Sequence, residues 1–290
     1  MNSTRQRHTG RLVVITALIC AAGSLGCIDY FVNRTIDKAV GTAADKVGER
    51  VGEAVAGAIL KDLTPELLQA YTMTTFQVLF YHGGYYMDSM DYKVGQFTRW
   101  DARGVQQGDT FERAFLHQRA DGAEWWRVES SGKDGDGKEQ RLVMEALIGK
   151  PDSVGNRQIR RMRALFPGEA EPREIAITEQ NASTWVVRSD RKLTPESMEG
   201  MTVGTEKIKV PAGEYTARHV QMKGYDGDQV LDWYVVETVP GQMVKYTNSI
   251  KDSNGKQEVI WDMALRQVGD GATTSKLGVK LDAAADGAKQ

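Results

Sequence analysis

The chain has 290 residues, a formal net charge of −2 and two cysteines. This near-neutral balance argues against a nucleic-acid-binding protein, which would need clustered basic charge. Both cysteines, Cys20 and Cys27, lie near the N-terminus. A product that begins at Cys27 and carries a lipid on its sulfur therefore has no free thiol for a cysteine nucleophile, a zinc–thiolate site or an iron–sulfur cluster.

Residues 1–26 have the layout of a secretory signal peptide. Arg5, Arg7 and Arg11 form a basic region, and an apolar run from Leu12 to Leu25 follows. The run is shorter than the roughly 20 residues of a comfortable membrane-spanning helix. Removal of this leader would take the net charge from −2 to about −5, because it holds three arginines and no acid.

The residues Ser24-Leu25-Gly26-Cys27 resemble the lipobox of bacterial lipoproteins. The resemblance implies cleavage before Cys27 and attachment to the membrane through a diacylglyceryl-cysteine, although Leu25 lies one place nearer the cysteine than the family prefers. Ile28 is not the aspartate associated with inner-membrane retention, so the resemblance implies a periplasm-facing protein of the outer membrane. Two alternatives stay open: cleavage near Ala22-Gly23-Ser24 to a soluble product, or an uncleaved anchor.

Residues 27–63 are predicted to form a tether and an amphipathic stalk helix. Between Thr35 and Leu60 the apolar residues recur at helical spacing. Small residues also recur at every fourth position, and they are Ala44, Gly48, Gly52 and Ala56. Rows of this kind allow helices to approach closely. The segment is interpreted either as a marginal, glycine-weakened helix or as a helix that forms a homo-oligomer or lies on the membrane.

Residues 64–268 are predicted to form one domain, a helix followed by an antiparallel sheet. Thr64-Pro65-Glu66 is typical of a helix start, and the helix is expected to run to Gly83-Gly84 and dock on the sheet. From Tyr92 onward the periodicity is two and turns are frequent, which favours a meander. The expected strands are Lys93–Ala102, Thr110–Arg119, Glu124–Ser130, Glu139–Ile148, Gln158–Leu165, Ile175–Thr178, Thr184–Asp190, Val203–Val210, Glu214–Lys223, Gln229–Glu237, Gln242–Asn248 and Gln257–Gln267.

The segment Gln229–Glu237 indicates how the sheet is covered. Leu231, Trp233 and Val235 share one face, and the other face is also apolar. A strand of this kind must be covered on both faces, which predicts a mainly β (α+β) fold with a curled antiparallel sheet or half-open β-barrel and a helix packed inside. The tail, residues 269–290, is small and polar and is predicted to be disordered.

Several pieces of the strands resemble a group of bacterial envelope proteins. They are Tyr92–Phe97, Glu124–Glu129, Arg141–Met144, Val210–Tyr215 and Val239–Tyr246. The group is related in shape to the lipoprotein-localisation carriers, and the resemblance covers about residues 64–268. It implies an open β-barrel whose concave cavity holds an acyl chain, a shape analogy that transfers function only weakly.

The chemistry of known enzyme and metal sites is not apparent in the sequence. None of the four histidines, His8, His82, His117 and His219, has a metal-ligand spacing, so we expect structural or exposed roles and no metal or cofactor. Asp134-x-Asp136-Gly137 begins like a calcium loop but lacks the later ligands, which favours a hairpin turn. The arginines 157, 160, 161 and 163 are interpreted as a solvated edge, with a contact to an anionic lipid headgroup or peptidoglycan as the alternative.

The leading functional hypothesis is a non-catalytic lipoprotein that binds a lipid or hydrophobic ligand in the concavity of the sheet. Its candidate ligand-binding residues are Trp126, Leu231, Trp233 and Val235. The alternative is a structural or protein-interaction lipoprotein in which the same residues form a filled core. An enzyme is the third hypothesis, because no catalytic constellation is visible in the sequence.

Overall fold

The computed structural model describes residues 64–282, except 82–85, 88–91, 105–108, 134–138, 179–180, 225–227 and 253. The predicted signal peptide, Cys27, the stalk helix, His82 and the turn at residues 134–137 lie outside the described residues. Within the described ranges, no helix has both the length and the apolarity needed to cross a bilayer.

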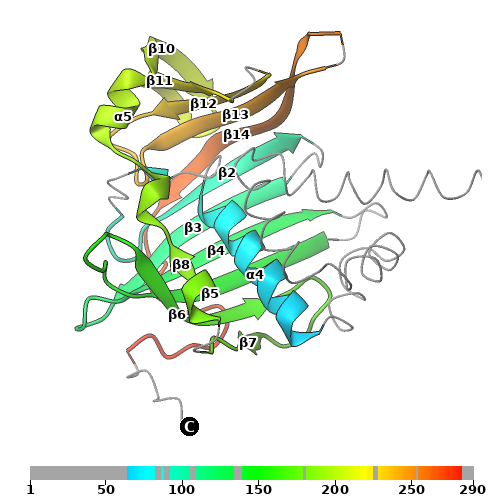
Figure 1. The fold of residues 1–290 in the computed structure, drawn as a ribbon, viewed down its shortest axis with the longest axis vertical. Coiled ribbons are helices and arrows are strands. Elements are labelled where there is room, and N and C mark those ends of the chain that lie inside the picture. The colour runs from blue at the N-terminus through cyan, green and yellow to red at the C-terminus, as the bar shows by residue number, and fades with distance from the viewer. Residues whose placement is uncertain are drawn as a thin grey trace, which may run out of the picture.

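A single antiparallel sheet dominates the described part of the chain (Figure 1). Its 12 described strands follow the order β10-β11-β12-β13-β14-β2-β3-β4-β5-β6-β7, and β8 pairs with β6 beside this path. The strands are β2 (Phe97–Gly104), β3 (Asp109–Gln118), β4 (Glu124–Lys133), β5 (Glu139–Ile148), β6 (Arg157–Leu165), β7 (Arg173–Ile175), β8 (Val186–Val187), β10 (Thr202–Val210), β11 (Gly213–Lys223), β12 (Gln229–Val235), β13 (Met243–Lys251) and β14 (Gln257–Gly269). The end strands β10 and β7 do not pair, so the sheet is not closed. The prediction of a mainly β, antiparallel fold is confirmed.

The sheet consists of two meanders joined side by side. Strands β2–β7, the first half-sheet, and β10–β14, the second half-sheet, each pair in chain order. The last strand, β14, then pairs with β2, from Trp261 opposite Gly104 to Gly269 opposite Phe97. The end of the domain is therefore placed beside its beginning, in the middle of the sheet.

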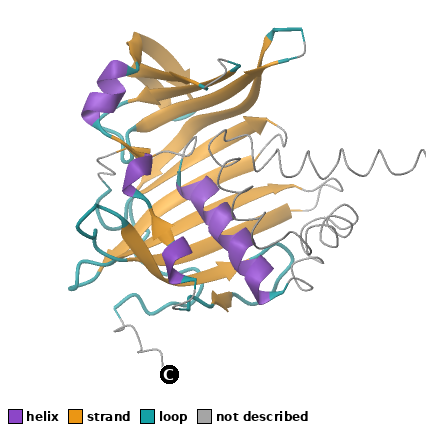
Figure 2. Ribbon diagram, in the orientation of Figure 1, coloured by secondary structure: helices purple, strands orange, loops and turns teal. Residues whose placement is uncertain are grey.

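Helix α4 (Pro65–Phe80) lies across the first half-sheet, against β3 and β4 (Figure 2). Its predicted start is confirmed: the Thr64 side chain accepts a hydrogen bond from the backbone N–H of Leu67, and proline occupies the first turn. The helix ends at Phe80 rather than at the predicted Gly83-Gly84, because Tyr81 adopts an extended backbone conformation.

The hydrophobic core lies on the face of the sheet that α4 covers, here called the inner face. Trp100, Phe115 and Trp126 alternate along β2, β3 and β4 with residues of the opposite, outer face, as the two-residue period of a strand requires. Phe80 of α4 packs edge-to-face on Trp126, with ring centroids 5.6 Å apart. A continuous layer of buried side chains thus fills the space between helix and sheet.

The connection between the half-sheets differs from the prediction of two strands. Of the predicted strand Ile175–Thr178 only Ile175 is in a strand, at the end of β7, and Thr184–Asp190 is broken up. The elements there are η2 (Ala182–Thr184), β8, η3 (Ser189–Arg191), β9 (Lys192–Leu193) and α5 (Pro195–Gly200), and β9 pairs in parallel with β1 (Tyr86–Met87). Packing accompanies this change, because Trp185, Val187, Leu193 and Met198 are all buried in the inner-face core, and only Val187 and Leu193 of these four lie in short strands.

Residues 270–282 are ordered by contacts with the outer face of the first half-sheet, contrary to the expectation of disorder from residue 269 onward. Ala272, Leu277 and Val279 are buried. Ala272 and Val279 share a second hydrophobic cluster with Trp125 and Leu147 of the outer face. Residues 283–290 lie outside the described residues.

Candidate functional site

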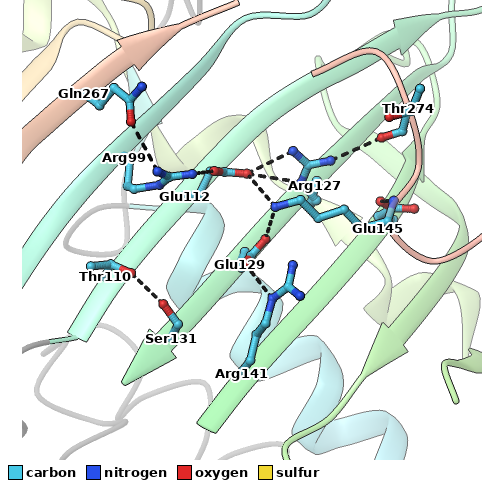
Figure 3. Close-up of polar contacts among 11 residues, drawn as sticks. Arg99, Thr110, Glu112, Arg127, Glu129, Ser131, Arg141, Glu145, Gln267 and Thr274 are labelled. Atoms are coloured by element: carbon cyan, nitrogen blue, oxygen red, sulfur yellow. Dashed lines mark hydrogen bonds and ion pairs between the residues drawn. The ribbon is translucent and has the colours of Figure 1, made fainter. Parts of the chain in front are cut away.

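The outer face of the first half-sheet carries a network of charged side chains (Figure 3). Strand pairing places Arg99 opposite Glu112, and Glu112 opposite Glu129, in one row across β2, β3 and β4. A neighbouring row places Arg127 opposite Glu145. The network lies on the face opposite the inner-face core, at alternate positions of these strands.

Glu112 is the centre of this network. One carboxylate oxygen accepts a hydrogen bond from Arg99 Nη2 at 2.5 Å, and the other accepts from Arg127 Nη2 at 2.9 Å. Burial of its side chain by itself raises the pKa of Glu112, but the Arg99 hydrogen bond and the charges of Lys276 and Arg127 outweigh burial. The pKa of Glu112 therefore lies below its ordinary value, and the carboxylate is ionised at neutral pH.

Two glutamates of the network stand directly opposite each other. Glu112 and Glu129 form a cross-strand pair between β3 and β4, and like charges in this position destabilise a sheet. Lys276, from the C-terminal segment, lies between them: its Nζ is 2.6 Å from Glu129 Oε2 and 3.5 Å from Glu112 Oε1. The C-terminal segment thus supplies the cation that makes this pairing tolerable.

Glu145 fixes the same segment to β5. Its carboxylate is fully buried and accepts hydrogen bonds from the backbone N–H of Lys276, at 2.8 Å, and from the Ser275 hydroxyl. The Ser275 Oγ in turn accepts from the backbone N–H groups of Leu277 and Val279. These bonds satisfy backbone groups that would otherwise be buried without partners, so they explain why a glycine-rich, polar segment is ordered.

Beside the network lies a cavity of about 300 Å³. It opens over β14, β2, β3 and β4 and is lined by Arg99, Thr110, Glu112, Glu129, Ser131 and Arg266. Thr110 and Ser131 are a cross-strand pair whose hydroxyl oxygens are 2.7 Å apart. We call these six residues the outer pocket.

The four predicted ligand-binding residues lie in the inner-face core, away from the outer pocket. Trp126, Leu231, Trp233 and Val235 are 2%, 3%, 0% and 3% exposed. Trp126 stacks on Phe115 at 4.8 Å and meets Tyr92 edge-to-face at 5.2 Å. Their positions are filled by the protein's own side chains.

Beneath the C-terminal end of α4, Arg113 is buried among aromatic rings. Its Nη1 donates to the backbone oxygen of Phe80 at 2.7 Å, and its Nε donates to the Tyr92 hydroxyl at 3.2 Å. The guanidinium lies 5.5 Å from the ring centroid of Trp100. Gly241 approaches so closely that a Cβ there would lie 2.5 Å from Arg113 Nη2. This arginine holds the end of the helix against the sheet.

The described histidines contact carboxylates that their sequence positions do not reveal. His219 lies between Glu206 and Asp232, with its Nδ1 at 3.0 Å from the first and its Nε2 at 2.7 Å from the second. His117 Nε2 is 2.7 Å from Asp282. In the part of the chain that the structure describes, no three histidine, cysteine or acidic side chains are placed to hold a metal ion together.

The basic cluster on β6 is ion-paired. Its contacts are Arg157 with Glu124, Arg160 with Asp121, and Arg161 and Arg163 with Glu174. The interpretation as a solvated position fits Arg160 and Arg161, whose side chains are 40% and 39% exposed. Arg157 and Arg163 are 17% and 22% exposed, and β6 is not an edge strand, because it pairs with β5, β7 and β8. The contact with a lipid headgroup or peptidoglycan stays a prediction.

The outer-face network was not found from the sequence. A signal was present in Arg127 and Glu129, which alternate with the apolar Trp126 and Val128 and therefore share the other face of the strand. Alternation does not reveal the register, which brings Glu112 opposite Glu129, or the distant Lys276. Comparison of the chain with models of protein families, with curated proteins and with solved structures gives no match.

Proposed function

We propose that the protein is a non-catalytic lipoprotein of the bacterial outer membrane, attached through Cys27, whose β-sheet domain faces the periplasm and acts by binding at its surface. In this proposal the curled sheet is a half-open barrel whose concavity is filled by α4 and the chain between the two half-sheets. The lipobox-like residues before Cys27 support the attachment. The stalk, residues 28–63, provides a spacer or a site of self-association.

One observation favours a core filled by side chains over a cavity that holds a ligand. Trp126, Leu231, Trp233 and Val235, the residues expected to hold a hydrophobic ligand, are at most 3% exposed. Protein interiors are packed to the density of organic crystals. A ligand at these positions would have to displace side chains that already contact one another, as Trp126 contacts Phe115.

Native mass spectrometry of the full chain, extracted from its host membrane, tests this proposal. We expect the mass of the protein with its covalent lipid and no second lipid, also after incubation with phospholipid, when the measurement is made on Arg266→Gln, in which the outer pocket lacks this arginine for an anionic headgroup. The variant Trp126→Ala, incubated with benzene, is the positive control, because an apolar cavity of this kind takes up small apolar molecules. A phospholipid bound to Arg266→Gln would contradict the filled core, and a mass without covalent lipid would contradict attachment through Cys27.

The second candidate is a carrier in which α4 moves aside and a lipid takes its place. The observation that favours it is the aromatic surface beneath the helix, where Phe80 of α4 contacts Trp126 and Trp126 in turn stacks on Phe115. This surface would become accessible if Arg113 released the backbone oxygen of Phe80. The same mass measurement on Arg266→Gln decides between the candidates, because only the carrier retains a lipid in its core.

A further inference from the structure

The outer pocket presents more positive than negative charge to solvent. Its two carboxylates belong to Glu112 and Glu129, whose side chains are 5% and 14% exposed. Its two guanidinium groups belong to Arg99 and Arg266, whose side chains are 37% and 55% exposed. A solute that enters the pocket therefore meets the cations first, while the carboxylates form the floor.

The acceptors of the pocket are already occupied. The two oxygens of Glu112 accept from Arg99 and Arg127. The two oxygens of Glu129 contact Arg141, at 2.7 Å, and Lys276, at 2.6 Å. All four carboxylate oxygens thus have a cationic partner, so the floor has little capacity to accept hydrogen bonds from a ligand.

Donors, in contrast, remain available. A guanidinium has five N–H donors; Arg99 uses one toward Glu112 and one toward Gln267, and Arg266 uses one toward Asp101. Of the paired hydroxyls of Thr110 and Ser131, one donates to the other, which leaves the second hydroxyl proton free for a ligand. The pocket combines two guanidinium groups and one hydroxyl as donors around a single cavity.

We propose that the outer pocket binds a phosphate group. A phosphate carries several acceptor oxygens in a tetrahedral arrangement, and guanidinium groups recognise phosphate through paired, charge-assisted hydrogen bonds. Arg99 and Arg266 hold the phosphate oxygens, and the hydroxyl pair of Thr110 and Ser131 donates from the third side. Asp101, which pairs with Arg266 at 2.9 Å, sets the orientation of that arginine.

The volume of the cavity is compatible with a small ligand group. A volume of about 300 Å³ accommodates a phosphate ester with a small polar substituent, such as glycerol phosphate. The same group occurs free and as the headgroup of an anionic phospholipid, and the pocket recognises the chemistry that both share. This inference concerns a different face from the filled core and does not depend on attachment through Cys27.

Isothermal titration calorimetry on the full chain in detergent tests the site with two probes, glycerol 3-phosphate and monomeric short-chain phosphatidylglycerol. We expect binding of the phosphate ester, about tenfold weaker in Arg266→Gln, because one charge-assisted contact is lost. Lys251→Gln is the matched control: Lys251 is also exposed and paired with an acid, Asp228, but it lies outside the pocket. Thr110→Val, which removes a hydroxyl at nearly constant volume, is expected to weaken binding severalfold.

The two probes distinguish a lipid headgroup from a free phosphate ester as the ligand. Much tighter binding of the phospholipid, lost in Arg266→Gln, assigns the site to a lipid headgroup, whereas equal binding of both probes assigns it to free phosphate esters. No binding of either probe at millimolar concentration overturns the proposal. Binding that Arg266→Gln and Lys251→Gln reduce equally also overturns it, since a general charge effect then explains the affinity.

Discussion

The two half-sheets are alike in pairing but differ in how their faces are covered. In the first, residues 142–148 of β5 are all buried, because α4 lies on one face and residues 270–282 lie on the other. In the second, the outermost strand β10 has a single buried residue, Val210. The difference shows that burial on both faces depends on segments far away in the chain. Four substitutions test this comparison.

The largest loss of stability is expected for a substitution at the centre of the inner face of the first half-sheet. Trp126→Ala removes a ring that contacts Phe80, Tyr92 and Phe115. Truncation of a buried tryptophan leaves a cavity and costs about 3–5 kcal/mol of the free energy of unfolding. Chemical denaturation of the full chain measures this loss, and a loss below about 1 kcal/mol would mean that α4 does not cover Trp126 in solution.

A smaller effect is expected on the outer face, at Glu112, and it depends on pH. Because the pKa of Glu112 is lowered by folding, its charge stabilises the folded state above its ordinary pKa of 4.5, and this contribution is lost as the pH falls toward the lower folded pKa. Glu112→Gln should cost about 2 kcal/mol at pH 7, since it weakens the charge-assisted hydrogen bonds from Arg99 and Arg127.

Stability measured between pH 7 and pH 3 checks the sign of this effect. The free energy of unfolding of the unaltered protein should decline more steeply below pH 5 than that of the Glu112→Gln variant. Parallel curves for the two proteins would show that Glu112 has the same pKa in the folded and unfolded chains.

A still smaller loss of stability is expected for a substitution in the C-terminal segment, residues 270–282. Lys276→Met keeps the side-chain length and removes the charge between Glu112 and Glu129, which should cost about 1 kcal/mol or less. Because the Glu112 and Glu129 side chains are only 5% and 14% exposed, salt screens the remaining repulsion weakly, and the loss should shrink only slightly in 1 M sodium chloride. Lys245→Met in the second half-sheet is the matched control, since the Lys245 side chain is 32% exposed against 34% for Lys276. Its ammonium pairs with Asp262 at 3.9 Å and lies over the Tyr234 ring, so it does not stand between two carboxylates in this way.

The smallest effect is expected on the uncovered edge. Val203 on β10 is 62% exposed, and substitutions at such surface positions usually change stability by less than about 0.5 kcal/mol. Val203→Thr should therefore leave the denaturation midpoint almost unchanged. A large loss would reveal that β10 is covered in solution by a partner or by residues outside the described part of the chain.

The strands were the most predictable part of the fold. Glu139–Ile148 was predicted with the bounds that β5 has, and Thr110–Arg119 lies within one residue of β3 at each end. Alternation of apolar residues and the turn residues between strands are local signals, so the sequence contains them directly. The helix α5 was missed although Thr194-Pro195-Glu196 repeats the signature used for α4.

The outer-face network and the order of the C-terminal segment were not predictable in the same way. Lys276 and Glu145 are 131 positions apart in the chain, and neither residue has a neighbour in the sequence that points to the other. A composition of glycine, serine and threonine normally accompanies disorder. Here a few hydrogen bonds to a buried carboxylate compensate for the low apolar content, and only the folded sheet brings that carboxylate into place.

The position of β14 has a consequence for how the chain folds. Each half-sheet forms by local pairing, which is fast because the loops to be closed are short. The joining step must wait for residues 257–269, the last strand to be synthesised, to reach β2, which begins at residue 97. Until then the edges of β2 and β13 are both open, and open edges are templates for pairing with other chains. Strand β14 thus joins the two half-sheets, and a chain interrupted before Gln257 is left with two separate sheets.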